Sequence, residues 1–215
     1  MLYSYTDTIP VVSGSLYVDL EVPDTARDVV VFAHGAGSSR LSPRNTRIAT
    51  YLRSTGYFGT LLFDLLTPTE DLIYENRFDI DLLTGRLVEA TRWVRSQGCC
   101  WNLPIAYFGA STGAAAALCA AAELPDVVRA VVSRGGRPDL AGGALAQVRV
   151  PVLLIVGELD TLVLELNRKA ARQILGPTET VIVPGATHLF EEPGTLDEVA
   201  RWTLEFLERR LVRAA

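Results

Sequence analysis

The tightest constraint on the fold is the pentapeptide Gly109-Ala110-Ser111-Thr112-Gly113, which joins two segments of different character. The apolar run Leu103 to Phe108 precedes it and is typical of a buried strand, whereas the Ala-rich run 114–118 that follows is typical of a buried helix. Where a strand turns directly into a helix, the positions two before and two after the apex press against both elements, so glycine is needed there. The spacing predicts a sharp strand-turn-helix with Ser111 exposed at its apex. The alternative is a Gly-rich turn in which the Ser has no role.

The rest of the chain alternates between apolar runs and amphipathic stretches. Weak alternation over about 11–22 predicts one or two antiparallel edge strands. Further strands are expected at 28–33, 60–64, 103–108, 127–132, 151–156 and 180–183. Helices are expected at 43–55, 80–95, 114–124, 162–175 and 195–213, with a polar loop over 67–79 and at most a short helix over 139–147. Repeated β-α alternation predicts one α/β domain over residues 1–215, with a mostly parallel sheet and helices on both faces.

Composition narrows the classes of partner and compartment. The formal net charge is −5 and no block of Lys or Arg stands out, so nucleic acid is not an expected partner. The start, Met1 to Tyr5, lacks the features of a signal peptide, and the apolar runs are too short to span a bilayer. The three Cys residues have no disulfide-framework spacing, which favours free thiols. We therefore expect a cytoplasmic protein with no membrane partner.

The carboxyl ends of parallel strands meet at one edge of a sheet, and Ser111 belongs to that edge. A Ser hydroxyl is a weak nucleophile at neutral pH and needs a base within hydrogen-bond reach. The chain has only two His residues. His188 follows the last expected strand and can reach back to Ser111, so it is the predicted base. His34 precedes Gly35 at the end of a buried strand and is expected to shape a turn. His34 and Gly35 could each contact a substrate.

The base in turn needs a carboxylate that fixes its tautomer. Asp160 follows the strand expected at 151–156 and gives the order Ser111, Asp160, His188. Glu158 lies in the same turn and stays open as the alternative acid. Asp64 is less favoured because it would place the acid ahead of the nucleophile.

A tetrahedral oxyanion would need preorganised N–H donors. The N–H of Thr112 is one candidate, and the segment Gly35-Ala36-Gly37 offers a second, which we assign to Ala36. Arg134 and Arg137 follow the strand expected at 127–132, on the same edge. Either could bind a substrate carboxylate, or could form a structural pair with Asp139.

Four segments together resemble the α/β-hydrolase superfamily, and within it the dienelactone-hydrolase-like branch of small enzymes. They are His34-Gly35-Ala36-Gly37, Gly109-Ala110-Ser111-Thr112-Gly113, Gly157-Glu158-Leu159-Asp160 and Gly185-Ala186-Thr187-His188. The resemblance implies an eight-stranded, mostly parallel sheet with no metal or organic cofactor. Dienelactone hydrolase proper carries Cys as its nucleophile, so its lactone chemistry is not carried over to Ser111.

The expected activity follows from these residues and from the resemblance. Little room lies between 132 and 151 for a cap domain, so the site is expected to be open and covered only by the 65–79 segment. We expect a serine hydrolase whose substrate is a small molecule with a carboxylic ester, lactone or thioester bond. A peptidase, acyltransferase or perhydrolase could use the same triad, and a non-catalytic binding protein could share the fold. A homodimer is possible.

Overall fold

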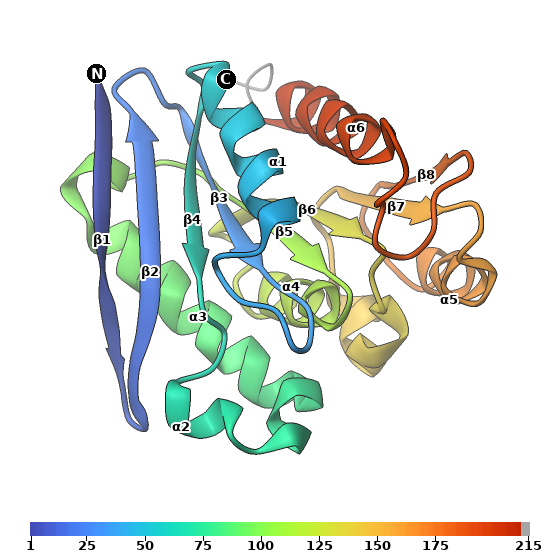
Figure 1. Cartoon of the computed structure of the whole chain (residues 1–215), viewed down its shortest axis with the longest axis horizontal. Coiled ribbons are helices and arrows are strands. Elements are labelled where there is room, and N and C mark those ends of the chain that lie inside the picture. The colour runs from blue at the N-terminus through green and yellow to red at the C-terminus, as the bar shows by residue number, and fades with distance from the viewer. Residues whose placement is uncertain (212–215) are drawn as a thin grey trace.

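The computed structural model describes residues 1–211 and is built around an eight-stranded sheet (Figure 1). The strands lie in the order β1-β2-β4-β3-β5-β6-β7-β8. β1 and β2 form an antiparallel hairpin, β2 pairs antiparallel with β4, and the remaining pairs are parallel. This confirms the predicted mostly parallel α/β sheet. The bounds are β1 Leu2–Val11, β2 Gly14–Pro23, β3 Asp28–Ala33, β4 Phe58–Phe63, β5 Ile105–Ala110, β6 Val128–Arg134, β7 Val152–Gly157 and β8 Thr178–Val183.

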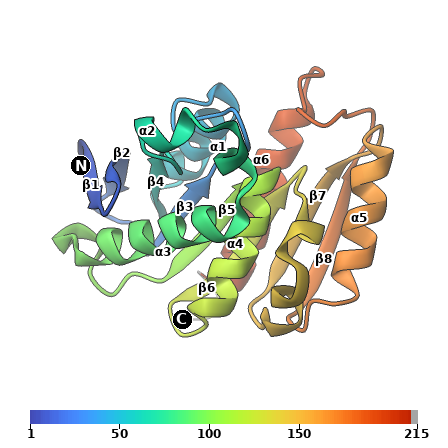
Figure 2. The same cartoon turned by 90° about the horizontal axis from the view of Figure 1, so that it is seen from below.

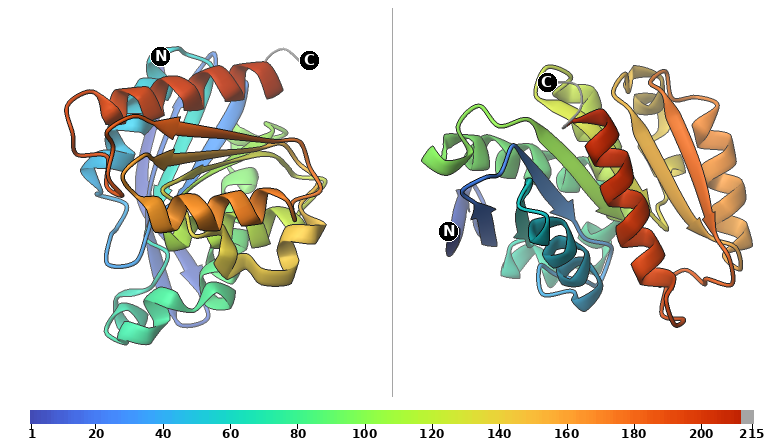
Figure 3. Two further views of the ribbon diagram at one scale, coloured as in Figure 1. Left: turned by 90° about the vertical axis from the view of Figure 1, so that its right-hand side faces the viewer. Right: turned by 90° about the horizontal axis from the view of Figure 1, so that it is seen from above.

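Helices cover both faces of the sheet, as the β-α alternation predicts. Figures 2 and 3 show α1 and α6 on one face and α3, α4 and α5 on the other. Alternate residues of β5 divide between the two cores, because Tyr107 packs on the α3–α4 side and Phe108 on the α1–α6 side. The bounds are α1 Pro43–Ser54, α3 Ile80–Ser96, α4 Thr112–Glu123, α5 Thr161–Ala171 and α6 Thr195–Arg210. The last residues expected in the terminal helix, 212 and 213, lie outside the described residues.

The N-terminal hairpin is longer than the sequence predicted. β1 begins at Leu2, whereas alternation was visible only from about residue 11. The first six residues of β1 are exposed, because β1 is an edge strand and covers little of the core. A strand that buries almost nothing has no apolar period, so the sequence gave no signal for it.

The segment 67–79 was predicted to be a polar loop, and this prediction was wrong. It contains the short helix α2, Pro68–Asp71, and a 3₁₀ turn at Tyr74–Phe78. Thr67 and Glu70 form a reciprocal capping box at the start of α2. Glu70 also forms an ion pair with Arg86 of α3, which anchors the segment beside the sheet edge. By contrast, residues 138–147 form only a 3₁₀ segment, so no cap domain is inserted between β6 and β7.

No helix in residues 1–211 has the length and apolar character that a membrane crossing requires.

Asp28 opens β3 with only 2% of its surface exposed, at the end of the strand away from His34. Burial raises the pKa of Asp28 to about 6, and the charge of Arg27 offsets only part of this effect. Between about pH 4 and pH 6 the folded protein keeps Asp28 protonated, whereas the unfolded chain has already released this proton. Stability therefore falls as the pH rises through this range, and the ionised carboxylate destabilises the fold at neutral pH. We expect Asp28→Asn to raise the free energy of unfolding by about 2–3 kcal/mol at pH 7.

Urea unfolding at pH 7 and pH 4 tests this expectation. The advantage of Asp28→Asn should shrink to nearly nothing at pH 4, where the native Asp28 is already protonated. The exposed Asp126 provides a control, because Asp126→Asn should change stability by less than about 0.5 kcal/mol at either pH. A gain that is equal at both pH values would contradict the assignment to Asp28 ionisation.

Candidate active site

Ser111 occupies the turn between β5 and α4 in a conformation that L-residues rarely adopt. Its φ is 50° and its ψ is −120°. A Cβ on Gly109 would lie 2.4 Å from the Ala114 Cα, and a Cβ on Gly113 would lie 2.3 Å from the carbonyl oxygen of Ala33. Both glycines are therefore needed, because a side chain at either position would collide with the neighbouring backbone. The strain at Ser111, on the order of 1–3 kcal/mol, is held by the packing around the turn.

His188 and Asp160 lie in contact at the same edge of the sheet. Asp160 follows β7 and is largely buried, and its Oδ2 lies 2.6 Å from the Nδ1 of His188, which follows β8. Glu158, the alternative acid, instead accepts a hydrogen bond of 2.8 Å from the N–H of Gly185. Asp64 accepts hydrogen bonds from the backbone N–H and the guanidinium of Arg40. The structure thus gives His188 one carboxylate partner and gives the two other candidates local structural roles.

Ser111 and His188 line one cavity of about 200 Å³. Gly35 and Ala36 line it from the loop after β3, and Arg134 lines it from the end of β6. Within residues 1–211 no hydrogen bond joins the Ser111 hydroxyl to the His188 ring. Hydrogen bonds of this kind are often longer before a substrate binds, so the shared cavity is the relevant geometry.

The two expected oxyanion donors differ in their present hydrogen bonding. The N–H of Thr112 is the first in α4 and has no partner in the described part of the chain. The N–H of Ala36 donates to the Thr112 hydroxyl, with 3.0 Å between the heavy atoms. Ala36 therefore lies where the sequence predicted, but its N–H becomes available to a ligand only when this hydrogen bond opens. The sequence carries no signal for a contact between residues 76 positions apart.

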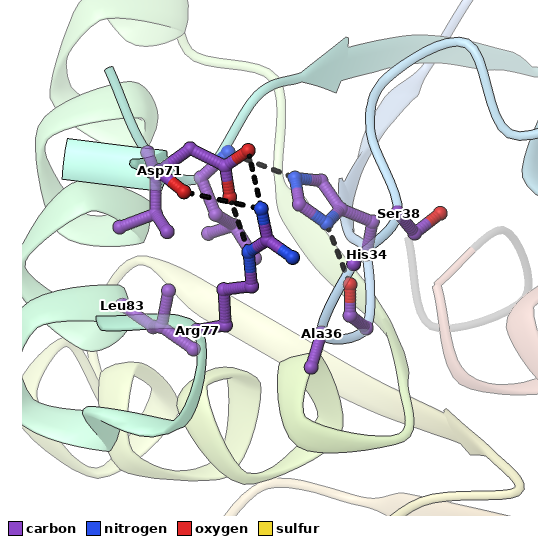
Figure 4. A pocket seen from close by; sticks show the side chains of 10 residues that line it. His34, Ala36, Ser38, Asp71, Arg77 and Leu83 are labelled. Carbon is purple, nitrogen blue, oxygen red and sulfur yellow. Dashed lines mark hydrogen bonds and ion pairs between the residues drawn. The ribbon is translucent and has the colours of Figure 1, made fainter. Parts of the chain in front are cut away.

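His34 is buried and both of its ring nitrogens have partners. Nδ1 lies 2.9 Å from the carbonyl oxygen of Gly35, and Nε2 accepts a hydrogen bond of 3.0 Å from the N–H of Leu65. Burial lowers the pKa of His34, so the ring is neutral at pH 7 and donates through Nδ1. Figure 4 shows the ring across a small pocket from the ion pair of Asp71 and Arg77. His34 thus joins the loop after β3 to the end of β4, and it does not line the Ser111 cavity.

The two arginines after β6 have different environments. Arg137 makes a two-bond pair with Asp139, at 2.9 and 2.7 Å, which is the structural alternative considered from the sequence. Arg134 is 7% exposed, and its Nε and Nη1 have no hydrogen-bond partner within residues 1–211. Burial and the neighbouring charge of Arg44 lower the pKa of Arg134 to about 10, so it stays charged at neutral pH.

Among residues 1–211, no three side chains of the His, Cys, Asp and Glu types come together as a metal site would require.

Comparison with known proteins gives relatives over nearly the whole chain. The crystal structure of dienelactone hydrolase from Anabaena variabilis is similar at 48% identity and a TM-score of 0.94, covering 98% of this chain and 99% of that one. The esterase domain of a Rhodothermus marinus protein has a TM-score of 0.77 at 20% identity, covering 97% of this chain and 99% of that domain, a likeness of fold alone. No family model matches the chain.

A curated relative from Mycobacterium tuberculosis, provisionally named a phosphoribosyl transferase, is 54% identical over 207 residues. The match covers 94% of this chain and 46% of that protein. The chain therefore spans about half the length of the curated relatives it matches.

The close approach at Gly113 gives a direct test of the turn geometry. We expect Gly113→Ala to lower the free energy of unfolding by at least about 2 kcal/mol, because the new methyl group meets a backbone carbonyl of β3. Gly85→Ala is a matched control, since Gly85 also lies in a helix but faces open space. That variant should be more stable by about 0.5–1 kcal/mol. Thermal or urea unfolding followed by circular dichroism measures both, and equal effects of the two substitutions would contradict the packing argument.

Proposed function

Because the chain belongs to the dienelactone-hydrolase family of α/β-hydrolases, we propose that it hydrolyses a carboxylic ester, lactone or thioester through an acyl-enzyme on Ser111. The observation that carries this proposal is the 2.6 Å contact between Asp160 and His188, beside a strained Ser111 that lines the same cavity as His188. This is the set of groups that activates a Ser hydroxyl for attack on a carbonyl carbon.

Acylation begins when His188 takes the hydroxyl proton of Ser111 as Oγ attacks the carbonyl carbon. Asp160 accepts a hydrogen bond from Nδ1–H of His188, which leaves Nε2 as the proton acceptor. The same carboxylate stabilises the imidazolium that forms. His188 then gives its proton to the departing alkoxide, alcohol is released, and the acyl group stays on Ser111.

The negative charge on the former carbonyl oxygen falls near the start of α4. The unpartnered N–H of Thr112 supplies one donor, supported by the positive end of the helix dipole. The N–H of Ala36 supplies a second when the substrate oxygen replaces the Thr112 hydroxyl as its acceptor. Water, deprotonated by His188, then attacks the acyl carbon, the Oγ–acyl bond breaks, and the carboxylic acid leaves as His188 returns the proton to Ser111 Oγ.

The thiols in the chain are poor alternatives to Ser111 as the nucleophile. Burial raises the pKa of both Cys100 and Cys119, which disfavours the reactive thiolate. Neither residue lines the cavity that contains His188. The Ser at this position supports an esterase, and the specialised lactone chemistry of Cys-dependent relatives is not part of the proposal.

The M. tuberculosis relative that is named a phosphoribosyl transferase is about twice as long as this chain, and its name describes the whole of that longer protein. The arrangement of Ser111, His188 and Asp160 supports acyl chemistry in this chain, which matches about half of that protein. A peptidase, an acyltransferase and a perhydrolase remain as alternatives that a substrate panel of esters, thioesters, amides and peroxide acceptors separates.

Activity-based labelling tests the nucleophile. A fluorophosphonate probe should label the native protein and spare Ser111→Ala, and kcat/KM for 4-nitrophenyl butyrate should fall by at least about 10⁴-fold in that variant. Asp160→Asn should lower kcat by about 10³–10⁴-fold, because the His188 tautomer is no longer held. Glu158→Gln is the matched control, since its amide oxygen can still accept from Gly185, and it should retain labelling. Equal labelling of the native protein and Ser111→Ala would refute the assignment.

A further inference from the structure

β1 is an edge strand of the sheet, and its outer side is unpaired within residues 1–211. The strand is ten residues long, and its register with β2 runs without a bulge. Natural sheets protect an edge of this length with Lys, Pro, a bulge or a covering loop, because free N–H and C=O groups bind other strands. Between Leu2 and Ile9 the sequence has no Lys, Arg or Pro, and Asp7 is its one charged residue. Most of this edge is therefore open to a further strand.

The backbone of β1 alternates in the direction of its hydrogen-bonding groups, as in any antiparallel pair. The carbonyl oxygen of Met1 accepts a hydrogen bond of 3.1 Å from the N–H of Asp24, which continues the β1–β2 ladder, so the odd-numbered residues face β2. Pro10 has no N–H to donate and belongs to the opposite set, as expected for a proline in an edge strand. The outward N–H and C=O groups are therefore those of Leu2, Ser4, Thr6 and Thr8.

These four outward residues can all be paired by a second copy of the chain in one antiparallel register. In that register Tyr5 faces Tyr5 of the partner subunit at a twofold axis. Leu2 then faces Thr8 of the partner subunit, and Ser4 faces Thr6 of the partner subunit. By symmetry each of these pairs occurs twice, and each exchanges two backbone hydrogen bonds. The strand edge is thus complementary to itself.

Asp7 and Pro10 favour this register over its neighbours. In it, Asp7 faces the uncharged Tyr3 of the partner subunit, and Pro10 lies beyond the paired residues. An axis at Thr6 pairs Leu2 with Pro10 of the partner subunit, which has no N–H to donate. An axis at Asp7 places two carboxylates opposite each other, which destabilises a sheet. An axis closer to the start of β1 pairs fewer of the outward residues, so one alignment is preferred.

Tyr3 and Tyr5 add an aromatic surface to this edge. Their rings stack with each other, and Tyr5 stacks with Trp93 of α3, with 6.2 Å and 6.4 Å between the ring centroids. Tyr3 is 43% exposed and Tyr5 is 37% exposed. Pairing at the twofold axis brings the Tyr side chains of the two copies together on one face of the joined sheet, and aromatic cross-strand pairs stabilise antiparallel ladders. The contact therefore buries aromatic surface that a single copy leaves in water.

An apolar hollow of about 370 Å³ opens at the Met1 end of the same edge. Figures 1 and 2 show the turn after α3 lying outside β1 on one face of the sheet, and Cys99 and Leu103 near this turn help to line the hollow. In the register above, the β1–β2 turn of the second copy passes this end of the strand. That turn includes Val12 of the partner subunit, a residue that is fully exposed in a single copy. The hollow thus offers this side chain an apolar contact.

We infer that two copies of this chain associate by antiparallel pairing of β1 with β1, with the twofold axis at Tyr5, so that the two sheets join into one. No residue of β1 lines the Ser111 cavity, so the association goes beyond the proposed function and does not depend on it. Because each copy has a net charge of −5, salt that screens their repulsion should strengthen the dimer.

Sedimentation equilibrium measures the association. The native protein should form a dimer in a concentration-dependent way below about 200 µM. Tyr5→Lys, which places two ammonium groups at the axis, should raise the Kd of the dimer at least about 10-fold. Tyr51→Lys is the matched control, because Tyr51 of α1 is similarly exposed at 41%, and it should leave the Kd as it is. A native protein that stays monomeric, or a dimer that Tyr5→Lys does not weaken, would overturn the inference.

Proline substitution tests the backbone pairing. The N–H of Thr6 points away from β2, so Thr6→Pro removes hydrogen bonds of the dimer and none of the β1–β2 ladder. The variant should keep the native circular dichroism spectrum and be monomeric at concentrations where the native protein is a dimer. Thr8→Pro, at another outward position, gives the same test should the first variant fold poorly. A folded variant that dimerises as tightly as the native protein would refute the pairing.

Disulfide cross-linking tests the register. With oxidised glutathione as the oxidant, Tyr5→Cys should become linked to its copy, since residues that face each other at a non-hydrogen-bonded position have Cα atoms about 4.5 Å apart. Tyr17→Cys, at an exposed position of β2, is the matched control and should not form this link. Peptide mass spectrometry separates the expected link from any link through Cys99. A dimer in which Tyr5→Cys stays unlinked would have another interface, and the inference would fail.

A peptide of residues 2–9 distinguishes a second copy from a different partner. The peptide should compete with the native dimer and increase the monomer fraction in sedimentation. Should the native protein stay monomeric and still bind the peptide, the edge would accept a strand of another protein, and the inference of a dimer would be rejected.

Discussion

The approach of the Ser111 turn to the end of β3 is the contact on which the site depends. Gly113 lies against the carbonyl oxygens of Ala33 and His34, with no room for a methyl group. This packing holds Ser111 at its positive φ and brings Gly35 against its Cβ, so Ser111 and the loop with Ala36 are positioned by one contact. His34 fixes the start of the same loop, because its Nε2 accepts a hydrogen bond from the N–H of Leu65. Backbone packing thus fixes the position of Ser111 relative to the loop that contains Ala36.

Sequence reasoning predicted the fold where the signal was local. Strands such as β3 and β7 are apolar on both faces and were readable as runs, and the Ser111 turn is encoded by two glycines at fixed spacing. With two His residues in the chain, few candidates existed for the proposed base, and His188 is the one that contacts a carboxylate. The choice between Asp160 and Glu158 was open because both lie in one turn, and only the folded loop gives Glu158 its bond to Gly185.

The misses share a different physical cause. β1 buries too little surface to leave a period, and α2 depends on a capping box, Thr67 with Glu70, that a composition-based reading of the loop passes over. The bond from Ala36 to Thr112, and the burial of Arg134 beside the Ser111 cavity, arise only when distant segments meet. The two His residues show the same dependence. Among residues 1–211, His34 has partners at both ring nitrogens, whereas His188 has one at Nδ1.

The cavity beside Ser111 is lined by residues from several elements and from the loops between them. Arg44 comes from α1, Arg134 from the end of β6, and Leu189 from the loop after β8. None of the three belongs to the turn or to the pair of Asp160 and His188. Single substitutions at these positions can therefore change which ligands fit the cavity and leave Ser111, His188 and Asp160 in place. In a fold without an inserted cap, natural or engineered substitutions can therefore change selectivity separately from the groups proposed for the chemistry.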